Sequence, residues 1–214
     1  MIKIFNVYKY YDRSKCIQIF FLVFAFIIFK NHGIILCMKV YQIIVGPLET
    51  NCYIVVYPER SRGEQGRRAV IVDPGDDAEK IIKVAEENDL RPKGILLTHA
   101  HFDHVGALEE IKNHFQIKLM SPSTSEVDGL EIIKTPGHTP DGVCLVNEKE
   151  GVIFSGDTLF KNSIGRTDFP GGDYEQIKKS LAKIMKYPDH FKVYPGHGPG
   201  TTIGEERKTN PFLK

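Results

Sequence analysis

The sequence contains no tryptophan, only four cysteines and almost no net charge. The cysteines form no Cys-x-x-Cys pair and are too scattered for the disulfide framework of a small secreted protein. We therefore expect Cys52 and Cys144 to be small buried apolar residues. Because 28 Lys and Arg face 27 Asp and Glu, no basic excess indicates nucleic-acid binding. The sequence also lacks internal repeats and low-complexity segments, which leaves an ordinary globular domain.

The first 37 residues differ in character from the rest of the chain. They carry a net charge of +4, whereas residues 38–214 carry −3. Residues 16–29 are nearly all apolar or aromatic, but as a helix they would rise only about 21 Å, less than the roughly 30 Å core of a bilayer. Three interpretations stay open: translation from Met38, a membrane or interfacial anchor, and an uncleaved signal peptide. We expect residues 38–214 to be the functional domain, cytoplasmic unless residues 16–29 form an anchor.

Short β-like runs alternate with amphipathic stretches in residues 38–214. Strands are predicted at residues 40–45, 53–57, 69–72, 94–97, 131–134, 143–146, 152–155 and 191–194. One helix is predicted from Asp76, with Glu79 completing a capping box, a second from Ala107, and a last one capped by Asp173. The crossover between residues 69–72 and 94–97 predicts two parallel strands. The charged residues 58–68 are typical of a solvated hairpin tip.

Histidine and aspartate follow several of these strands directly. Imidazole and carboxylate together suit zinc, iron or manganese. His99 and His101 lie two residues apart in an extended loop, so both can reach one metal. Asp103 and His104 come where the chain turns into a helix and can reach a second metal. Three more candidates follow later strands, each beside a glycine: His138, Asp157 and His197.

Four motifs surround these residues: THAHFDH, TPGHT, GDTLF and YPGHGP. Together they resemble the metallo-β-lactamase-fold hydrolases, and residues 156–173 and 195–212 resemble the short, glyoxalase-II-like (hydroxyacylglutathione hydrolase-like) branch. The resemblance covers nearly all of residues 38–214. It implies a four-layer αββα sandwich, an α+β fold in which two mixed sheets are flanked by helices and the site lies at one edge of the sheets.

The resemblance also implies roles for individual residues. His99, His101 and His138 would hold one metal, Asp103, His104 and His197 a second, and Asp157 would bridge them. Two divalent ions, most simply Zn²⁺ with iron or manganese as alternatives, would present a bridging hydroxide to a thioester carbonyl. Asp103 and Asp157 are accordingly the expected catalytic residues, and a small-molecule thioester is the expected substrate. Asp73 would either support the ligand loop or cap a turn.

Arg166 is a candidate substrate anchor, because a guanidinium can hold a carboxylate bidentately. The alternative is a structural ion pair with Asp168 or Asp173. The first two of three departures from the glutathione-specific enzymes point to a different or smaller thioester. The helical C-terminal domain is missing, Asp168 replaces an aromatic residue, and the segment between His104 and His138 is short, with residues 120–128 in place of a longer stretch. The last departure predicts either an unusually open site or a locally compromised fold.

Two other functions stay open at this stage. GRTDF also resembles persulfide dioxygenases of the same fold, which use one iron held here by His99, His138 and Asp157. A metal-stabilised binding or redox-sensing domain without catalysis is the second. A nucleic-acid-processing member is disfavoured by the net charge of −3 over residues 38–214, and the glyoxalase-like C-terminal segment disfavours a β-lactam substrate.

Overall fold

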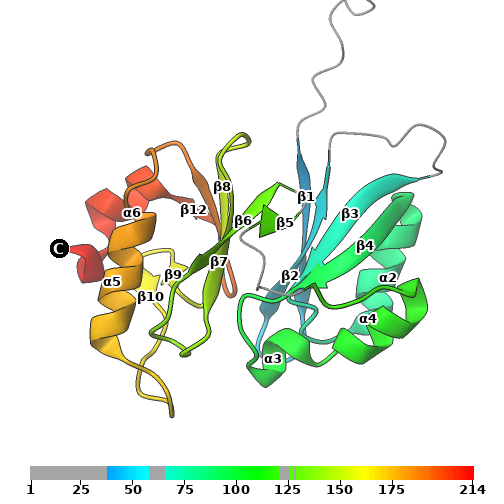
Figure 1. Ribbon diagram of the computed structural model, residues 1–214, viewed down its shortest axis with the longest axis horizontal. Helices are drawn as coiled ribbons and strands as arrows, with labels where there is room; N and C mark the ends of the chain where they lie inside the picture. Colours follow the sequence, from blue (N-terminus) through cyan, green and yellow to red (C-terminus); the bar gives the residue numbers. More distant parts are fainter. Residues whose placement is uncertain (1–37, 58–65, 121–125, 128) are drawn as a thin grey trace, which may run out of the picture. The chain divides into compact units, whose positions relative to one another are not determined.

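The computed structural model describes residues 38–57, 66–120, 126–127 and 129–214 (Figure 1). The predicted extension 1–37 and most of the hairpin tip 58–68 lie outside the described residues, as do residues 121–125 and 128 of the shortened segment. None of the helices within the described part is long and apolar enough to cross a membrane.

The first sheet is built from the N-terminal half of residues 38–214. Its strands run in sequence order: β1 (Lys39–Val45), β2 (Thr50–Val56), β3 (Arg67–Val72) and β4 (Leu90–Leu96). The pairs β1–β2 and β2–β3 are antiparallel, whereas β3 and β4 are parallel, which confirms the predicted crossover. The crossover contains α2 (Ala78–Glu87). After β4 come the short helix α3 (Phe102–Val105) and then α4 (Leu108–Phe115).

The second sheet has the strand order β12-β11-β8-β7-β6-β5. It is also mixed, because β11 and β8 are parallel and the other neighbours are antiparallel. The strands are β5 (Glu126–Val127), β6 (Leu130–Lys134), β7 (Val143–Asn147), β8 (Val152–Gly156), β11 (Lys192–Pro195) and β12 (Thr201–Thr202). A small hairpin of β9 (Leu159–Phe160) and β10 (Ser163–Ile164) follows β8.

Three buried clusters show how the layers pack. In β2, Ile54 packs toward α2 and α4, whereas its neighbour Val55 packs toward the second sheet. In β7, Leu145 faces the first sheet and Val146 faces α5 (Tyr174–Ile184). Because alternate residues of a strand point to opposite faces, strands buried on both sides need continuous apolar runs. The predicted αββα sandwich is confirmed (Figure 1).

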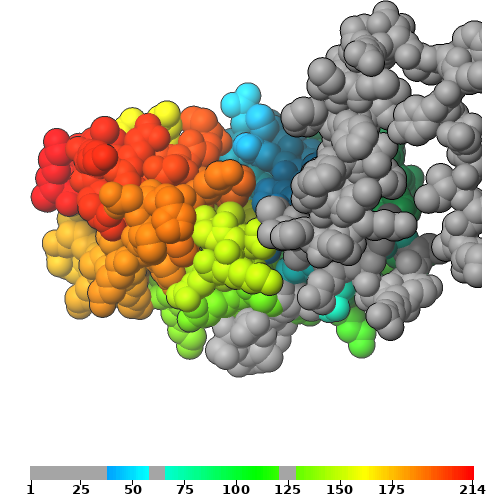
Figure 2. Space-filling view, turned by 90° about the horizontal axis from the view of Figure 1, so that it is seen from above, coloured from blue at the N-terminus to red at the C-terminus, as the bar shows by residue number. Residues whose placement is uncertain are grey.

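The C-terminal elements cover the outer face of the second sheet. They are α5, α6 (Ile203–Thr209) and the 3₁₀ turn η1 (Pro211–Leu213). Figure 2 shows this part in orange and red as one continuous surface. The Asp173 side chain accepts a bond from the Gln176 backbone N–H, which confirms the predicted cap of α5. The expectation that this helix is the last is wrong, since α6 follows.

Two local predictions are wrong for physical reasons. Helix α2 begins at Ala78 rather than at a capping box on Asp76, and its N-cap Asp77 makes no side-chain capping bond. The carboxylate of Asp77 instead accepts the backbone N–H of Gly46, in the turn between β1 and β2. Arg67 and Arg68 belong to β3 rather than to a hairpin tip. The Arg67 guanidinium donates to the Tyr41 hydroxyl, which keeps it on the sheet.

Candidate metal centre

The predicted ligand side chains come together at one edge of the two sheets. His99 and His101 follow β4, with Asp103 and His104 on α3, while the remaining three follow β6, β8 and β11 of the second sheet. Their ligand atoms form three groups, within each of which all atoms lie within 4.8 Å of one another. The groups are His99, His101 and His138; His99, His104 and Asp157; and Asp103, His104 and His197.

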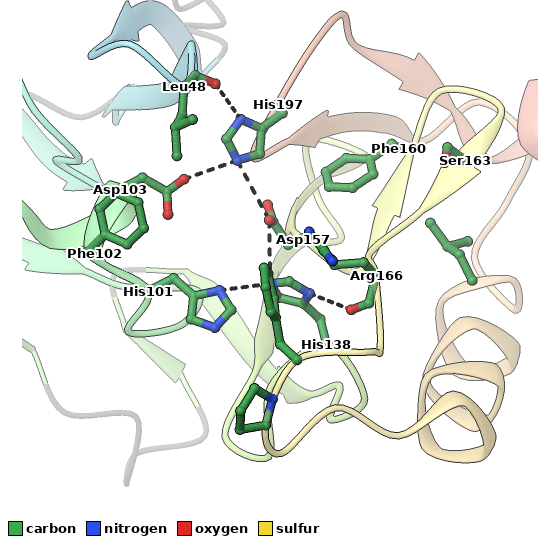
Figure 3. A pocket seen from close by; sticks show the side chains of 13 residues that line it. Leu48, His101, Phe102, Asp103, His138, Asp157, Phe160, Ser163, Arg166 and His197 are labelled. Carbon is green, nitrogen blue, oxygen red and sulfur yellow. Dashed lines mark hydrogen bonds and ion pairs between the residues drawn. The ribbon is translucent and has the colours of Figure 1, made fainter.

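Asp157 lies between the first and third groups (Figure 3). Its Oδ1 is 3.5 Å from Nε2 of His104, and its Oδ2 is 3.5 Å from Nε2 of His138 and 3.6 Å from Nε2 of His197. Nδ1 of His101 is 2.9 Å from Nε2 of His138, and Nε2 of His197 is 3.2 Å from Oδ2 of Asp103. Oδ2 of Asp157 therefore lies near a residue of the first group and a residue of the third, while Oδ1 faces His104 of the third group.

Four of the imidazoles are held by their Nδ1 atoms. His138 donates to the carbonyl oxygen of Arg166 at 2.7 Å and His197 to that of Leu48 at 3.0 Å. His104 donates to the Asp73 carboxylate at 3.0 Å. Nδ1 of His99 lies 3.1 Å from the Thr98 hydroxyl, whose own proton goes to Asp73. Because Nδ1 of each ring faces these partners, Nε2 is the nitrogen that points into the cluster, where a metal would take the place of any proton on it.

Three buried polar atoms inside the cluster make no hydrogen bond within the described residues: Nε2 of His99, Nε2 of His104 and Oδ1 of Asp157. A buried polar atom without a partner is costly, so such atoms need an explanation. All three are donor atoms that a divalent cation would complete. The residues present therefore fit a metal on both chemical and geometric grounds.

Asp73 supports the ligand loop from behind. Its carboxylate accepts the backbone N–H and the hydroxyl of Thr98, each at 2.7 Å, as well as Nδ1–H of His104. The residue is 1% exposed and adopts a positive φ of 50°. These contacts match the supporting interpretation of Asp73, because they fix both the start of the loop and the orientation of one ring.

Burial and charge oppose each other within the cluster. Burial lowers the pKa of His99 to about 4. Burial also acts to lower the pKa of His104, but Asp73 and Asp157 outweigh it and raise that pKa to about 10. For Asp157, burial acts to raise the pKa, and His104 outweighs it and lowers the pKa to about 2. The Asp157 carboxylate thus stays ionised and favours a cation beside it.

Gly196 is required by the closeness of these side chains. A Cβ atom at this position would collide with Oδ1 of Asp157 and lie 2.8 Å from Cε1 of His104. The absence of a side chain therefore lets the β11 loop approach the centre closely enough to deliver His197.

Two contributors were not predicted from the sequence. The Thr50 hydroxyl donates to Oδ2 of Asp103 at 2.9 Å. The Asn51 side-chain amide donates to the carbonyl oxygens of Pro195 and Gly198 at 3.0 and 2.9 Å, and its backbone N–H donates to that of Gly196 at 2.7 Å. Both residues are 1% exposed and belong to β2. The signal was a polar pair that opens an apolar strand and lies just before the predicted strand 53–57.

A pocket of about 790 Å³ lies over the cluster. Besides ligand residues, it is lined by apolar side chains that include Leu48, Phe102, Phe160 and Phe169, and by Arg166 (Figure 3). The Arg166 guanidinium forms a bidentate ion pair with Asp168, from Nε to Oδ1 at 2.7 Å and from Nη2 to Oδ2 at 2.5 Å. Arg166 thus lines the pocket, and the predicted ion pair with Asp168 is present.

A match to the metallo-beta-lactamase superfamily spans residues 45–127 and 123–197. The chain belongs to this superfamily. Hydroxyacylglutathione hydrolase GloC of Haemophilus influenzae is 34% identical over 82% of this chain and 98% of its own length. These findings confirm the resemblance. Members of this superfamily are typically metal-dependent hydrolases.

Solved structures of this superfamily share the fold. BLEG-1 B3 metallo-beta-lactamase has a TM-score of 0.74 and 36% identity, over 82% of this chain and all of that one. TTHA1623, solved in a di-iron-bound form, has a TM-score of 0.71 and 33% identity over 81% of this chain and all of that one.

Proposed function

We propose that the protein is a dinuclear-metal hydrolase of thioesters of the hydroxyacylglutathione type. The observation that carries the proposal is the position of Asp157, with one oxygen toward His104 and the other toward His138 and His197. His99, His101 and His138 would hold one ion, Asp103, His104 and His197 the other, with Asp157 shared between them. Two divalent ions, zinc in the first instance, would supply an ionised water at neutral pH and polarise a carbonyl oxygen.

The chain's own residues determine how that chemistry is positioned. The hydroxyl of Thr50 fixes one oxygen of Asp103, and Asp73 fixes the ring of His104. Asp103 and Asp157 are the proposed catalytic residues because they would touch the reacting water. The apolar side chains around the pocket exclude bulk water, which strengthens electrostatic interactions inside it.

The leaving group is the reason for preferring a thioester. Among the described residues that line the pocket there is no Lys, Tyr, Glu or Cys that could protonate a departing group. An amine must be protonated as it leaves, whereas a thiol of ordinary pKa, about 8.5, departs as a thiolate. The absence of a dedicated acid within the described lining therefore supports thioesters over amides. Relatedness to GloC supports hydroxyacylglutathione as the first substrate to test.

The single-iron dioxygenase needs only His99, His138 and Asp157. It would leave Asp103, His104 and His197 without a role, although their donor atoms lie within 4.8 Å of one another. The complete third group supports two metals per chain. The noncatalytic alternative differs from the proposal only in turnover, so the same experiment separates all three functions.

The test combines metal content with turnover on the full chain, purified without chelator or added metal. Elemental analysis should give two metals per chain, and S-lactoylglutathione should release thiol faster than the matched oxygen ester and amide are cleaved. One iron per chain with oxygen uptake on a persulfide would establish the dioxygenase instead. Two metals without turnover on any ester, thioester or lactone would establish a noncatalytic domain.

A further inference from the structure

One cationic side chain, Arg166, is found among the described residues that line the pocket. Its guanidinium makes two interactions, an ion pair with Asp168 and a cation–π contact with Phe169. Nε and Nη2 bind the two oxygens of Asp168, and the guanidinium carbon lies 3.8 Å from the ring centroid of Phe169. This bidentate fork is the geometry in which an arginine would bind a substrate carboxylate. In this structure, a carboxylate of the protein itself occupies that position.

The pair is not explained by stability. The side chains of Arg166 and Asp168 are 56% and 66% exposed, and ion pairs so exposed contribute little to folding. The pair does change the charge beside the pocket, because Asp168 offsets the positive charge of Arg166. Asp168 stays ionised, since Arg166 lowers its pKa to about 2. An incoming carboxylate must either displace Asp168 from Nε and Nη2 or bind through Nη1, and in both cases it lies beside the negative charge of Asp168.

The rest of the pocket mouth offers apolar contacts. Phe102, Leu48 and Phe169 line it and are 73%, 50% and 42% exposed. Large apolar side chains left exposed around a pocket are typical of a surface that a ligand covers. Figure 3 places Leu48 and Phe102 on one side of the metal-ligand cluster and Phe160 and Arg166 on the other. A neutral ligand with an apolar face would contact both sides without opposing charge.

We propose that Asp168 is a specificity-determining residue that, by occupying the Arg166 guanidinium, makes the pocket favour thioesters uncharged near Arg166 over those carrying a carboxylate there. This inference rests on the proposed thioesterase function and deepens it. Asp168 acts through Arg166, so the effect of its removal should depend on the presence of Arg166. That dependence separates a role in specificity from a general effect on folding or on the overall field of the protein.

The test measures binding and turnover separately. Binding uses S-methylglutathione and its diethyl ester, which differ in carboxylate charge and cannot be hydrolysed as thioesters. Turnover uses the lactoyl thioesters of glutathione and of glutathione diethyl ester. Asp168→Asn keeps the size of the side chain and removes its charge. We expect this variant to bind S-methylglutathione about tenfold more tightly, and to lower KM for the charged thioester with little change in kcat.

Two variants act as controls. In Arg166→Gln/Asp168→Asn the gain for the charged ligand should disappear, because no guanidinium remains to receive it. Glu87→Gln makes the same change in net charge on α2, where the side chain pairs with Lys83 at 3.9 Å. This variant should leave the preference between charged and neutral ligands at the wild-type value.

Equal effects of Asp168→Asn on both ligands, no effect on either, or a gain that persists in the double variant would each overturn the inference. Absence of binding to every variant would overturn it as well. Because the binding ligands need no hydrolysis, failure of the proposed thioesterase would appear separately, as charge-selective binding without turnover of either thioester.

Discussion

Each histidine that is held at Nδ1 presents Nε2 to the cluster. The group that holds Nδ1 differs from one histidine to the next. The spacing of the histidines in THAHFDH predicted only that these side chains could converge, and the full ligand set came from the family resemblance. Neither was enough to predict what holds them, since the Nδ1 partners include the carbonyl oxygens of Leu48 and Arg166. Backbone acceptors leave no trace in residue type, so sequence patterns cannot identify them.

At this scale, Asp73→Asn tests the support of the ligand loop. Asparagine keeps the shape of the side chain but has no negative charge to accept the Nδ1–H bond of His104. The protonation of Nδ1 and the orientation of the ring are therefore less strongly favoured. We expect metal affinity to fall by roughly 10- to 100-fold, the usual cost of losing such a partner. Competition with a chromophoric chelator measures the affinity. Asp89→Asn, at an exposed position after α2, is the control, and equal affinities in the two variants would rule out the role of Asp73.

Strands and helices were predictable where they are apolar on the faces they bury. The run Val143–Asn147 is buried throughout and was identified correctly except for its last residue. Predictions failed at polar ends, because strand pairing continues past the apolar run. β4 begins at Leu90, since its polar start pairs with Arg67 and Arg68 of β3. α6 was missed because it is short and its hydrophobic side chains are few.

Helix α5 allows a test of its cap as a function of pH. Two hydrogen bonds from Gln176 lower the pKa of Asp173: the bond from the side-chain amide has the larger effect and the bond from the backbone N–H the smaller. A lowered carboxyl pKa stabilises the folded state above the unfolded pKa of about 3.9, and this contribution is lost as the pH falls through the folded pKa. Asp173→Ala should therefore melt below the wild type at pH 7, by a margin that shrinks in acid.

Circular dichroism melts of the wild type, Asp173→Ala and Asp173→Asn from pH 7 to pH 3 measure this margin. Asparagine can accept the same backbone bond, so the Asn variant should stay close to the wild type at neutral pH. A margin for the alanine variant that is constant across the range would contradict a role for the carboxylate charge.

Helix α6 is attached to the pocket wall through Glu206, which is fully buried. Its carboxylate accepts bonds from the Thr201 hydroxyl at 2.6 Å, the Asn162 backbone N–H at 2.8 Å and the Asn210 side-chain amide at 2.8 Å. Asn162 lies between β9 and β10, whose residues Ser163 and Ile164 line the pocket. A C-terminal element therefore determines the position of the hairpin beside the metal centre.

Glu206→Ala should remove the acceptor of three buried or half-buried donors. We expect a loss of about 3 kcal/mol in the free energy of unfolding, because unsatisfied buried donors are costly. Urea unfolding measures the loss. Glu205→Ala, an exposed position on the same helix whose carboxylate pairs with Lys161 at 3.3 Å, is the control and should change stability by less than about 1 kcal/mol. Equal losses would show that Glu206 is not the attachment point.

For the molecule as a whole, the two sheets meet at the ligand cluster. The first group takes two ligands from the loop after β4 and one from the loop after β6, and the third group combines α3 with the loop after β11. Recognising this juxtaposition from sequence depended on a family resemblance. The contact between Asn51 and Pro195 spans 144 residues, and no local pattern specifies a partner at that distance.

Metal removal should accordingly destabilise the whole domain. At free metal a thousand times above Kd, binding stabilises the folded state by about 4 kcal/mol, which corresponds to a melting temperature about 10 °C higher for a domain of this size. Calorimetry of chelator-treated and metal-restored protein measures the difference. His197→Ala should show a smaller shift because one group is incomplete. Identical melting with and without metal would contradict coupling between the centre and the fold.

The Pro195 carbonyl oxygen, which accepts both the Tyr53 hydroxyl at 2.6 Å and the Asn51 amide at 3.0 Å, has a consequence for the order of folding. These bonds close loops of 142 and 144 residues, and long loops are costly to close before other contacts compensate. The two halves of the sandwich can therefore collapse around their own local contacts first and dock across this oxygen last. The ligand cluster is complete only after docking, so a refolding chain should acquire its metals in the final kinetic phase.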